Sequence, residues 1–98
     1  MNVIKRLEGS NLFVDIEGNI DSVTAPELHE SLTKSLNGVS SITFDFQKVN
    51  YISSAGLRVL LVATKAIKGG KVVVRNANNN VMDIFTMTGF VNILTIEN

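Results

Sequence analysis

The stretch YISSAGLRVLL, residues 51–61, joins an apolar strand-like segment to an apolar helix-like segment. Two serines, Ser53 and Ser54, stand at the join, and Gly56 falls in what should be the first turn of the helix. Serine is a good N-cap residue, worth about 1 kcal/mol, so one of the pair is expected to cap the helix. Glycine in a helix costs up to about 1 kcal/mol relative to alanine, and often occurs where another chain or a ligand approaches the backbone closely. The join is therefore a candidate contact surface as well as a helix cap.

Outward from this stretch, period-two and helical patterns alternate along the chain. Strands are predicted at residues 2–7, 12–17, 41–46, 72–74 and 91–96. Three helices are predicted: one from a capping box at Thr24-Ala25-Pro26-Glu27 to Asn37-Gly38, one over about 54–68, and one from the caps Asn78-Asn79-Asn80 to Gly89.

The resulting order is ββαβαβαβ, which predicts an α/β fold in a single domain over residues 1–98. The first two strands are separated by Glu8-Gly9-Ser10-Asn11 and are expected to form an antiparallel hairpin. The later strands alternate with helices, which favours parallel pairing through crossover connections. We therefore expect a mixed, mostly parallel sheet with helices packed on it. The three valines at 72–74 are typical of a strand covered on both sides.

Composition excludes several classes of function. The 98 residues carry nine basic and nine acidic side chains, which gives no electrostatic footprint for nucleic acid or an anionic membrane. There is no cysteine, and no apolar run approaches the ~18 residues that a membrane span needs. We expect a cytoplasmic protein that neither binds nucleic acid nor inserts into a membrane.

Few residues are suited to catalysis or metal binding. His29 is the only histidine and is expected on the solvated side of the first helix. Asp15, Glu17 and Asp21 could form a carboxylate cluster, but a solvated outer face is favoured. Gly69-Gly70-Lys71 follows a helix instead of opening one, so it indicates a helix stop and not a phosphate loop. We predict no catalytic residue, no metal site and no cofactor.

Arg58 lies near the start of the second predicted helix, an unfavourable end for a cation. It is interpreted either as a solvated side chain or as a contact to an acidic partner or to a phosphate on a nearby serine. A helix N-terminus accommodates a phosphate well, and the modification adds about −1.5 to −2 charge units. A phosphoserine here would leave the fold intact while changing the surface that a partner meets.

The segment FDFQKVNYISSAGLRVLL resembles the central signature of STAS domains of the anti-sigma factor antagonist type. In that family an apolar strand and a short link precede Asp-Ser-(Ser/Thr)-Gly-Leu and an apolar helix. Gly18-Asn19-Ile20-Asp21 is similar to the family's turn before the first helix, and residues 76–90 are similar to its late segment. This sequence differs from the signature at Ser53, Ala55 and Arg58.

The resemblance implies a function without catalysis. It aligns Ser54 with the family's phosphate acceptor and leaves Ser53 as a secondary acceptor. The implied partners are an anti-sigma factor that is also a GHKL-type serine kinase, bound by the unphosphorylated antagonist, and a PP2C-like phosphatase that removes the phosphate. The nucleotide would belong to the kinase. The expected contact surface comprises the turn 18–23, the junction 51–58 and the exposed side of the second helix, with these partner-binding residues: Asp21, Ser22, Ser53, Ser54, Gly56 and Arg58.

Two other functions stay open on the sequence. Some STAS proteins serve without phosphorylation as scaffold pieces of signalling assemblies or as accessory subunits of membrane lipid transporters. The altered signature residues Ser53, Ala55 and Arg58 motivate that alternative. An enzyme is the third and least favoured reading, and loss of turnover in Asp15→Asn or His29→Ala would support it.

Overall fold

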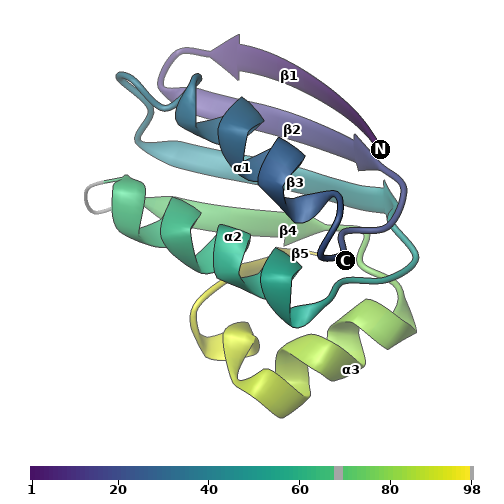
Figure 1. The fold of residues 1–98 in the computed structure, drawn as a ribbon. Helices are drawn as coiled ribbons and strands as arrows, with labels where there is room; N and C mark the ends of the chain where they lie inside the picture. The colour runs from purple at the N-terminus through teal and green to yellow at the C-terminus, as the bar shows by residue number, and fades with distance from the viewer. Residues whose placement is uncertain (68–69, 98) are drawn as a thin grey trace.

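The computed structural model describes residues 1–67 and 70–97, and Figure 1 shows the order of its elements. The strands are β1 (Asn2–Glu8), β2 (Asn11–Glu17), β3 (Ser41–Lys48), β4 (Lys71–Arg75) and β5 (Thr95–Glu97). The α-helices are α1 (Ala25–Thr33), α2 (Ser54–Ala66) and α3 (Asn79–Thr88), and a 3-10 turn, η1 (Phe90–Asn92), precedes the last strand. The predicted order ββαβαβαβ is confirmed, with η1 as the one addition among the described residues.

The five strands form one sheet in the order β1-β2-β3-β4-β5. β1 pairs with β2 antiparallel, and the remaining pairs, β2 with β3, β3 with β4 and β4 with β5, are parallel. This confirms the predicted mixed, mostly parallel sheet with a leading hairpin. Because the parallel strands end at one edge of the sheet, the loops that follow β2 and β3 are brought together there.

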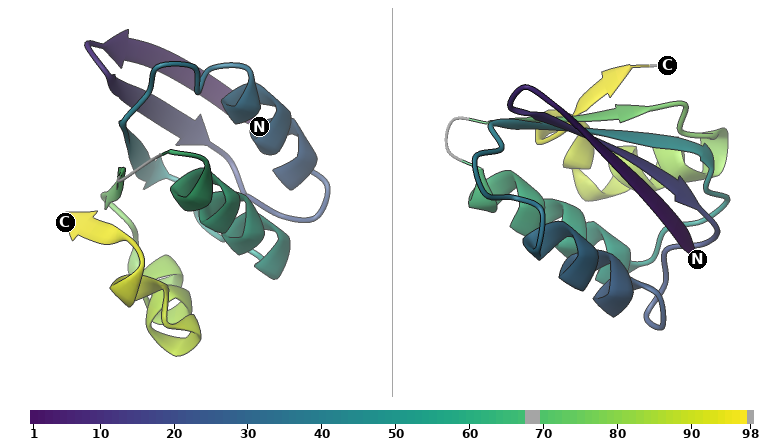
Figure 2. Two further views of the ribbon diagram at one scale, coloured as in Figure 1. Left: turned by 90° about the vertical axis from the view of Figure 1, so that its left-hand side faces the viewer. Right: turned by 90° about the horizontal axis from the view of Figure 1, so that it is seen from above.

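The helices lie on one side of the sheet. α1 and α2 lie side by side across one face, and α3 lies beyond α2 near the edge formed by β4 and β5 (Figures 1 and 2). Phe85 of α3 packs against Phe46 of β3, with ring centroids 6.2 Å apart, and Phe46 also meets Phe44 edge to face at 6.1 Å. All three rings are fully buried, so this aromatic cluster anchors α3 to the face that α1 and α2 cover.

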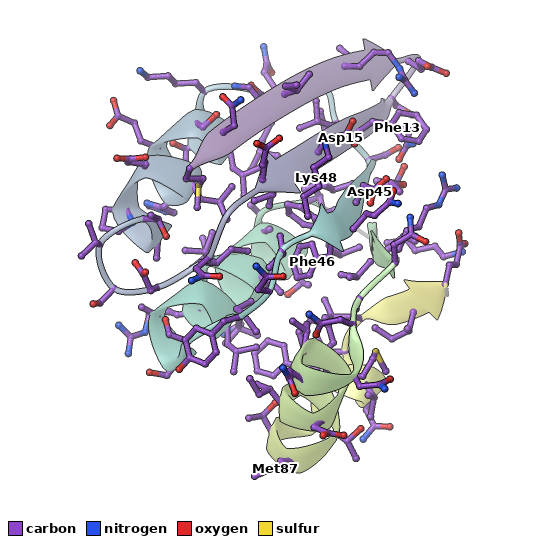
Figure 3. The ribbon with its side chains drawn as sticks, turned by 90° about the vertical axis from the view of Figure 1, so that its right-hand side faces the viewer. Phe13, Asp15, Asp45, Phe46, Lys48 and Met87 are labelled. Atoms are coloured by element: carbon purple, nitrogen blue, oxygen red, sulfur yellow. The ribbon has the colours of Figure 1, made fainter. Side chains whose placement is uncertain are left out.

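The other face of the sheet carries no helix among the described residues. Phe13, Asp15 and Asp45 lie together on β2 and β3 on this open face (Figure 3). The valines of β4 are all buried, as predicted, although Val73 faces the open side between Thr43 and Thr95 of its neighbouring strands. On the open face, Val73 is therefore buried between the neighbouring strands, without a second layer of helices.

The first helix ends earlier than predicted. The first helix ends at Thr33 and not at Asn37-Gly38, because the amide of Ser35 donates to the carbonyl of Leu32, three residues back, and the chain turns away. Gly38 does adopt the positive φ, 77°, that a helix stop would use, but it does so in the later turn that brings Val39 into the core. The glycine was correctly identified as a left-handed residue and assigned to the wrong turn.

The last strand is shorter than predicted. Gly89 ends α3 with φ 79°, as expected, but residues 90–92 form η1 instead of strand because the amides of Ile93 and Leu94 both donate to the carbonyl of Phe90. Only Thr95–Glu97 pairs with β4. The second helix ends at Ala66, before the predicted residue 68. Lys68, its predicted last residue, and Gly69, the first residue of the predicted helix stop, lie outside the described residues.

Candidate functional site

Two loops meet at the end of the sheet where β2 and β3 finish. Ile20 and Ile52 form an isolated parallel bridge. The amide of Ile20 donates to the carbonyl of Tyr51 at 3.0 Å, and the amide of Ser53 donates to the carbonyl of Ile20 at 2.8 Å. The predicted turn 18–23 and junction 51–58 are thus brought side by side, and backbone hydrogen bonds hold them in register.

The two serines of the junction have different environments. Ser53 is the N-cap of α2, and its hydroxyl oxygen accepts from the amide of Gly56 at 3.3 Å. Ser53 is half-buried, whereas Ser54, the first helical residue, is exposed. Within the described part of the chain the Ser54 hydroxyl has no hydrogen-bond partner. One serine therefore caps the helix, and the other presents a free hydroxyl to solvent.

Gly56 lies in the interior beneath these serines. A Cβ atom at this position would come within 2.6 Å of Ile52 Cγ1 and 2.7 Å of Ile20 Cγ2. Both neighbours are β-branched side chains, whose inner carbons cannot swing away freely. The close backbone approach that the glycine allows is thus between segments of this chain. A contact of Gly56 with a partner stays a prediction.

The start of α1 does not form the predicted capping box. Thr24 is the N-cap by position, but its hydroxyl donates to the carbonyl of Asn19 at 2.8 Å and accepts from the amide of Asp21 at 2.9 Å, so it caps no helical amide. The carboxylate of Asp21 accepts from the amides of Val23 and Thr24 at 2.9 and 3.0 Å. The prediction fails because Asp21 offers the hydroxyl and amide of Thr24 better partners inside the turn.

These hydrogen bonds set the protonation of Asp21. The amides of Thr24 and Val23 donate to the charged form of the carboxylate and lower its pKa below the ordinary value of 3.8. Asp21 is therefore an anion at neutral pH. One of its oxygens holds the turn 18–23 in shape, so the residue predicted to bind a partner also organises the loop that would present it.

A groove runs between α1 and α2 next to the junction. It encloses about 430 Å³ and is lined by Ser22, Ala25, Pro26, His29, Ala55, Arg58, Val59 and Val62. Arg58 and Ser22, both predicted partner-binding residues, are thus at the same surface, and His29 lies there too, exposed as predicted.

Two exposed apolar side chains at this end were not singled out by the sequence analysis. Val23, in the turn before α1, is 77% exposed, and Tyr51, just before the serines, is 48% exposed. The sequence offered a weak signal for them, because each is an apolar residue in a polar connecting segment between patterned elements.

The acidic residues do not form a metal site. Asp15 and Glu17 lie on β2, where Glu17 pairs with Lys48 at 3.5 Å, whereas Asp21 belongs to the separate turn before α1. In residues 1–67 and 70–97, no three acidic or histidine side chains are grouped so that they could hold a metal ion. Nor does any helix in those ranges have the length and hydropathy needed to cross a bilayer.

Comparison with known proteins identifies the architecture. The STAS domain family model matches residues 2–98. The chain belongs to the STAS domain family. BtrV of Bordetella bronchiseptica, whose name describes it provisionally as an anti-sigma factor antagonist, is 30% identical over 90 residues, which cover 89% of this chain and 78% of that protein. The anti-sigma-B factor antagonist of Bacillus subtilis is 29% identical over 99 residues, covering 99% of this chain and 91% of the relative.

Solved structures of STAS proteins share the fold. An anti-sigma factor antagonist from Mycobacterium paratuberculosis superposes with a TM-score of 0.86 at 20% identity, covering 97% of this chain and 83% of the other. SpoIIAA of Bacillus in its phosphorylated form superposes with a TM-score of 0.76 at 12% identity, covering 99% and 92% of the two chains. The resemblance read from the sequence is confirmed for the family and the fold.

Proposed function

We propose that this STAS protein is an anti-sigma factor antagonist that acts in the cytoplasm, without catalysis of its own, as a phosphorylation-controlled binding module. In its unphosphorylated form it binds an anti-sigma factor that is also a GHKL-type serine kinase. Phosphorylation of Ser54 releases the partner, and a PP2C-like phosphatase restores binding. The observation that carries this proposal is the exposed, unengaged hydroxyl of Ser54 beside a capping hydroxyl on Ser53.

The environments of the serines favour Ser54 as acceptor. A kinase has to reach the hydroxyl, and Ser54 offers it at the surface on the first residue of α2. Ser53 is half-buried, and its hydroxyl oxygen already accepts from the Gly56 amide, so it is less open to a kinase than Ser54. The named relatives are consistent with this function, and SpoIIAA, an anti-sigma factor antagonist, has been solved in a phosphorylated form.

The surface around Ser54 is suited to a protein partner. Tyr51 stands exposed three residues before the serine, and tyrosine is enriched among the residues that carry most of the binding energy of interfaces. Val23 adds exposed apolar surface at the same end of the sheet. Ser22 and Arg58 add polar groups at the groove between α1 and α2. A phosphate on Ser54 brings about two negative charges into this surface, and burying such a charge against a partner without compensation is costly.

The first test is site-localised phosphopeptide mass spectrometry on the protein isolated from its native host with phosphatase inhibitors. We expect a substoichiometric phosphate on Ser54 that varies with growth condition. Phosphate on Ser53 instead would show that the acceptor is misassigned by one residue. Absence of phosphate under every condition would overturn the switch and favour the scaffold or transporter-subunit function.

The second test compares partner capture by variants in the native host. Ser54→Asp is expected to weaken co-purification of the kinase at least tenfold, and Ser54→Ala to retain it whatever the growth condition. Ser10→Asp is the matched control, because it adds the same charge at an exposed serine in the β1–β2 turn, at the opposite end of the sheet. Equal capture by the two Ser54 variants would contradict the proposal.

A further inference from the structure

Arg58 differs from the other two arginines of the chain. Arg6 pairs with Glu8, and Arg75 pairs with Glu97 at 2.9 Å. Both guanidinium groups also lie over the ring of Phe13, at 4.7 and 5.9 Å from its centroid. Arg58 is exposed, and it forms no ion pair or hydrogen bond with any side chain in the described ranges. It is the one arginine whose charge has no internal partner there.

The surroundings of Arg58 offer no anion. Helix α2 contains neither aspartate nor glutamate. The groove beside Arg58 is lined otherwise by small or apolar side chains, the hydroxyl of Ser22 and the imidazole of His29. Of residues 1–67 and 70–97, Arg58 is therefore the one arginine or lysine that lines the groove, and no carboxylate lines it. The carboxylate of Asp21, in the turn that leads to α1, accepts from the backbone amides of Val23 and Thr24 and makes no ion pair with Arg58.

One side chain of α2 could become an anion beside Arg58. Ser54 precedes Arg58 by four residues in the same helix, so the two side chains share a face about 5–6 Å apart at Cβ. An anion placed four residues before a cation is the favourable order for a helical pair. A phosphate supplies three acceptor oxygens, and the planar guanidinium donates to two of them at once.

We propose that Arg58 is the internal counter-ion of a phosphate on Ser54, and that forming this pair takes away from the groove between α1 and α2 the one arginine or lysine that lines it among the described residues. The inference rests on the proposed phosphorylation of Ser54 and adds its mechanism. The modification then changes the surface twice: it places an anion at the start of α2, and it withdraws a cation that is otherwise free to bind a carboxylate of the partner.

The pair is tested on the whole chain with phosphoserine incorporated at position 54 during translation, so that no kinase is needed. The readout is the midpoint of the second phosphate ionisation, followed by phosphorus NMR against pH. His29 lines the same groove from α1. All titrations are therefore made in a His29→Gln background, so that Arg58 is the one basic side chain that lines the groove among the described residues.

We expect the midpoint to lie about 0.3 pH units lower with Arg58 present than in Arg58→Gln, because the guanidinium favours the dianion. Lys65→Gln is the matched control: it removes one positive charge from the exposed side of the same helix, eleven residues from Ser54, and is expected to leave the midpoint unchanged. In nitrogen–proton spectra, the Arg58 Nε–H signal should move and exchange more slowly with water when Ser54 is phosphorylated.

Equal midpoints for the parent and Arg58→Gln would overturn the counter-ion, and so would an equal shift caused by Lys65→Gln. Neither result depends on whether the host phosphorylates Ser54. Absence of phosphate in the host would overturn the proposed function even where the incorporated phosphate pairs with Arg58. The two failures are therefore distinguishable.

Discussion

The two helices that flank the groove begin side by side at the same end of the sheet, and they begin differently. At the start of α2 a single hydroxyl, that of Ser53, caps the helix by accepting from the Gly56 amide. At the start of α1 two side chains, Asp21 and Thr24, take part in five hydrogen bonds within one turn. The first arrangement leaves the Ser54 hydroxyl without a partner among the described residues, whereas the second engages both the Asp21 carboxylate and the Thr24 hydroxyl.

This difference separates the structural and functional parts of the surface. The turn before α1 is organised by its own polar groups, and it can hold Val23 and Ser22 in place at the surface. The start of α2 is organised from below, by the contact of Gly56 with Ile20 and Ile52. Packing and a single cap fix α2, and among the described residues the Ser54 hydroxyl takes part in neither.

The largest expected effect on the unfolding free energy comes from a substitution that disrupts the packing under α2. Gly56→Val should destabilise the fold by about 3 kcal/mol, because its side chain overlaps Ile20 and Ile52 in a filled core. Urea denaturation followed by circular dichroism gives the change in unfolding free energy. Lys65→Val, at an exposed position of α2, is the control for the helix propensity of valine and should cost about 0.5 kcal/mol. Similar losses in the two variants would show that Gly56 is not a packing position.

A smaller effect is expected to distinguish the two serines. Ser53→Ala removes the cap of α2 and should cost about 1 kcal/mol, whereas Ser54→Ala should change the unfolding free energy by less than about 0.5 kcal/mol. The same urea experiment measures both. If Ser54→Ala costs as much as Ser53→Ala, the hydroxyl of Ser54 has a structural role and its assignment as a free acceptor is wrong.

The smallest effect concerns the turn before α1 and depends on pH. Because the folded pKa of Asp21 lies below its ordinary value, the charged carboxylate stabilises the fold fully above pH 3.8, and this contribution is lost as the pH falls below 3.8 through the lower folded pKa. The melting temperature of the wild type should therefore exceed that of Asp21→Asn at pH 7, and the difference should shrink at pH 3. A difference that stays constant between these pH values would show that the charge of Asp21 does not support the turn.

Much of this site follows from local patterns that a reader can recognise in the sequence. Serine before an apolar helix predicted that one of the pair Ser53 and Ser54 caps α2, and the structure shows that it is Ser53. Asn78 likewise caps α3 by accepting from the amide of Val81 at 2.8 Å. Thr24 followed the same rule and was mispredicted, because Asp21, three residues earlier, competes for its hydroxyl and amide. A cap motif is reliable where no second short polar side chain lies within the same turn.

The sequence by itself determined the order of the elements, the mixed sheet and the family, because the alternation of apolar residues and the glycine and serine stops are local signals. Tertiary structure decided which serine is free, because that depends on where Gly56 packs. It also decided that Arg58 stands beside an apolar groove without a carboxylate, since the groove is formed by side chains of α1, some 30 residues away in the chain. Neighbours distant in sequence leave no local pattern, and only the folded chain brings them into contact.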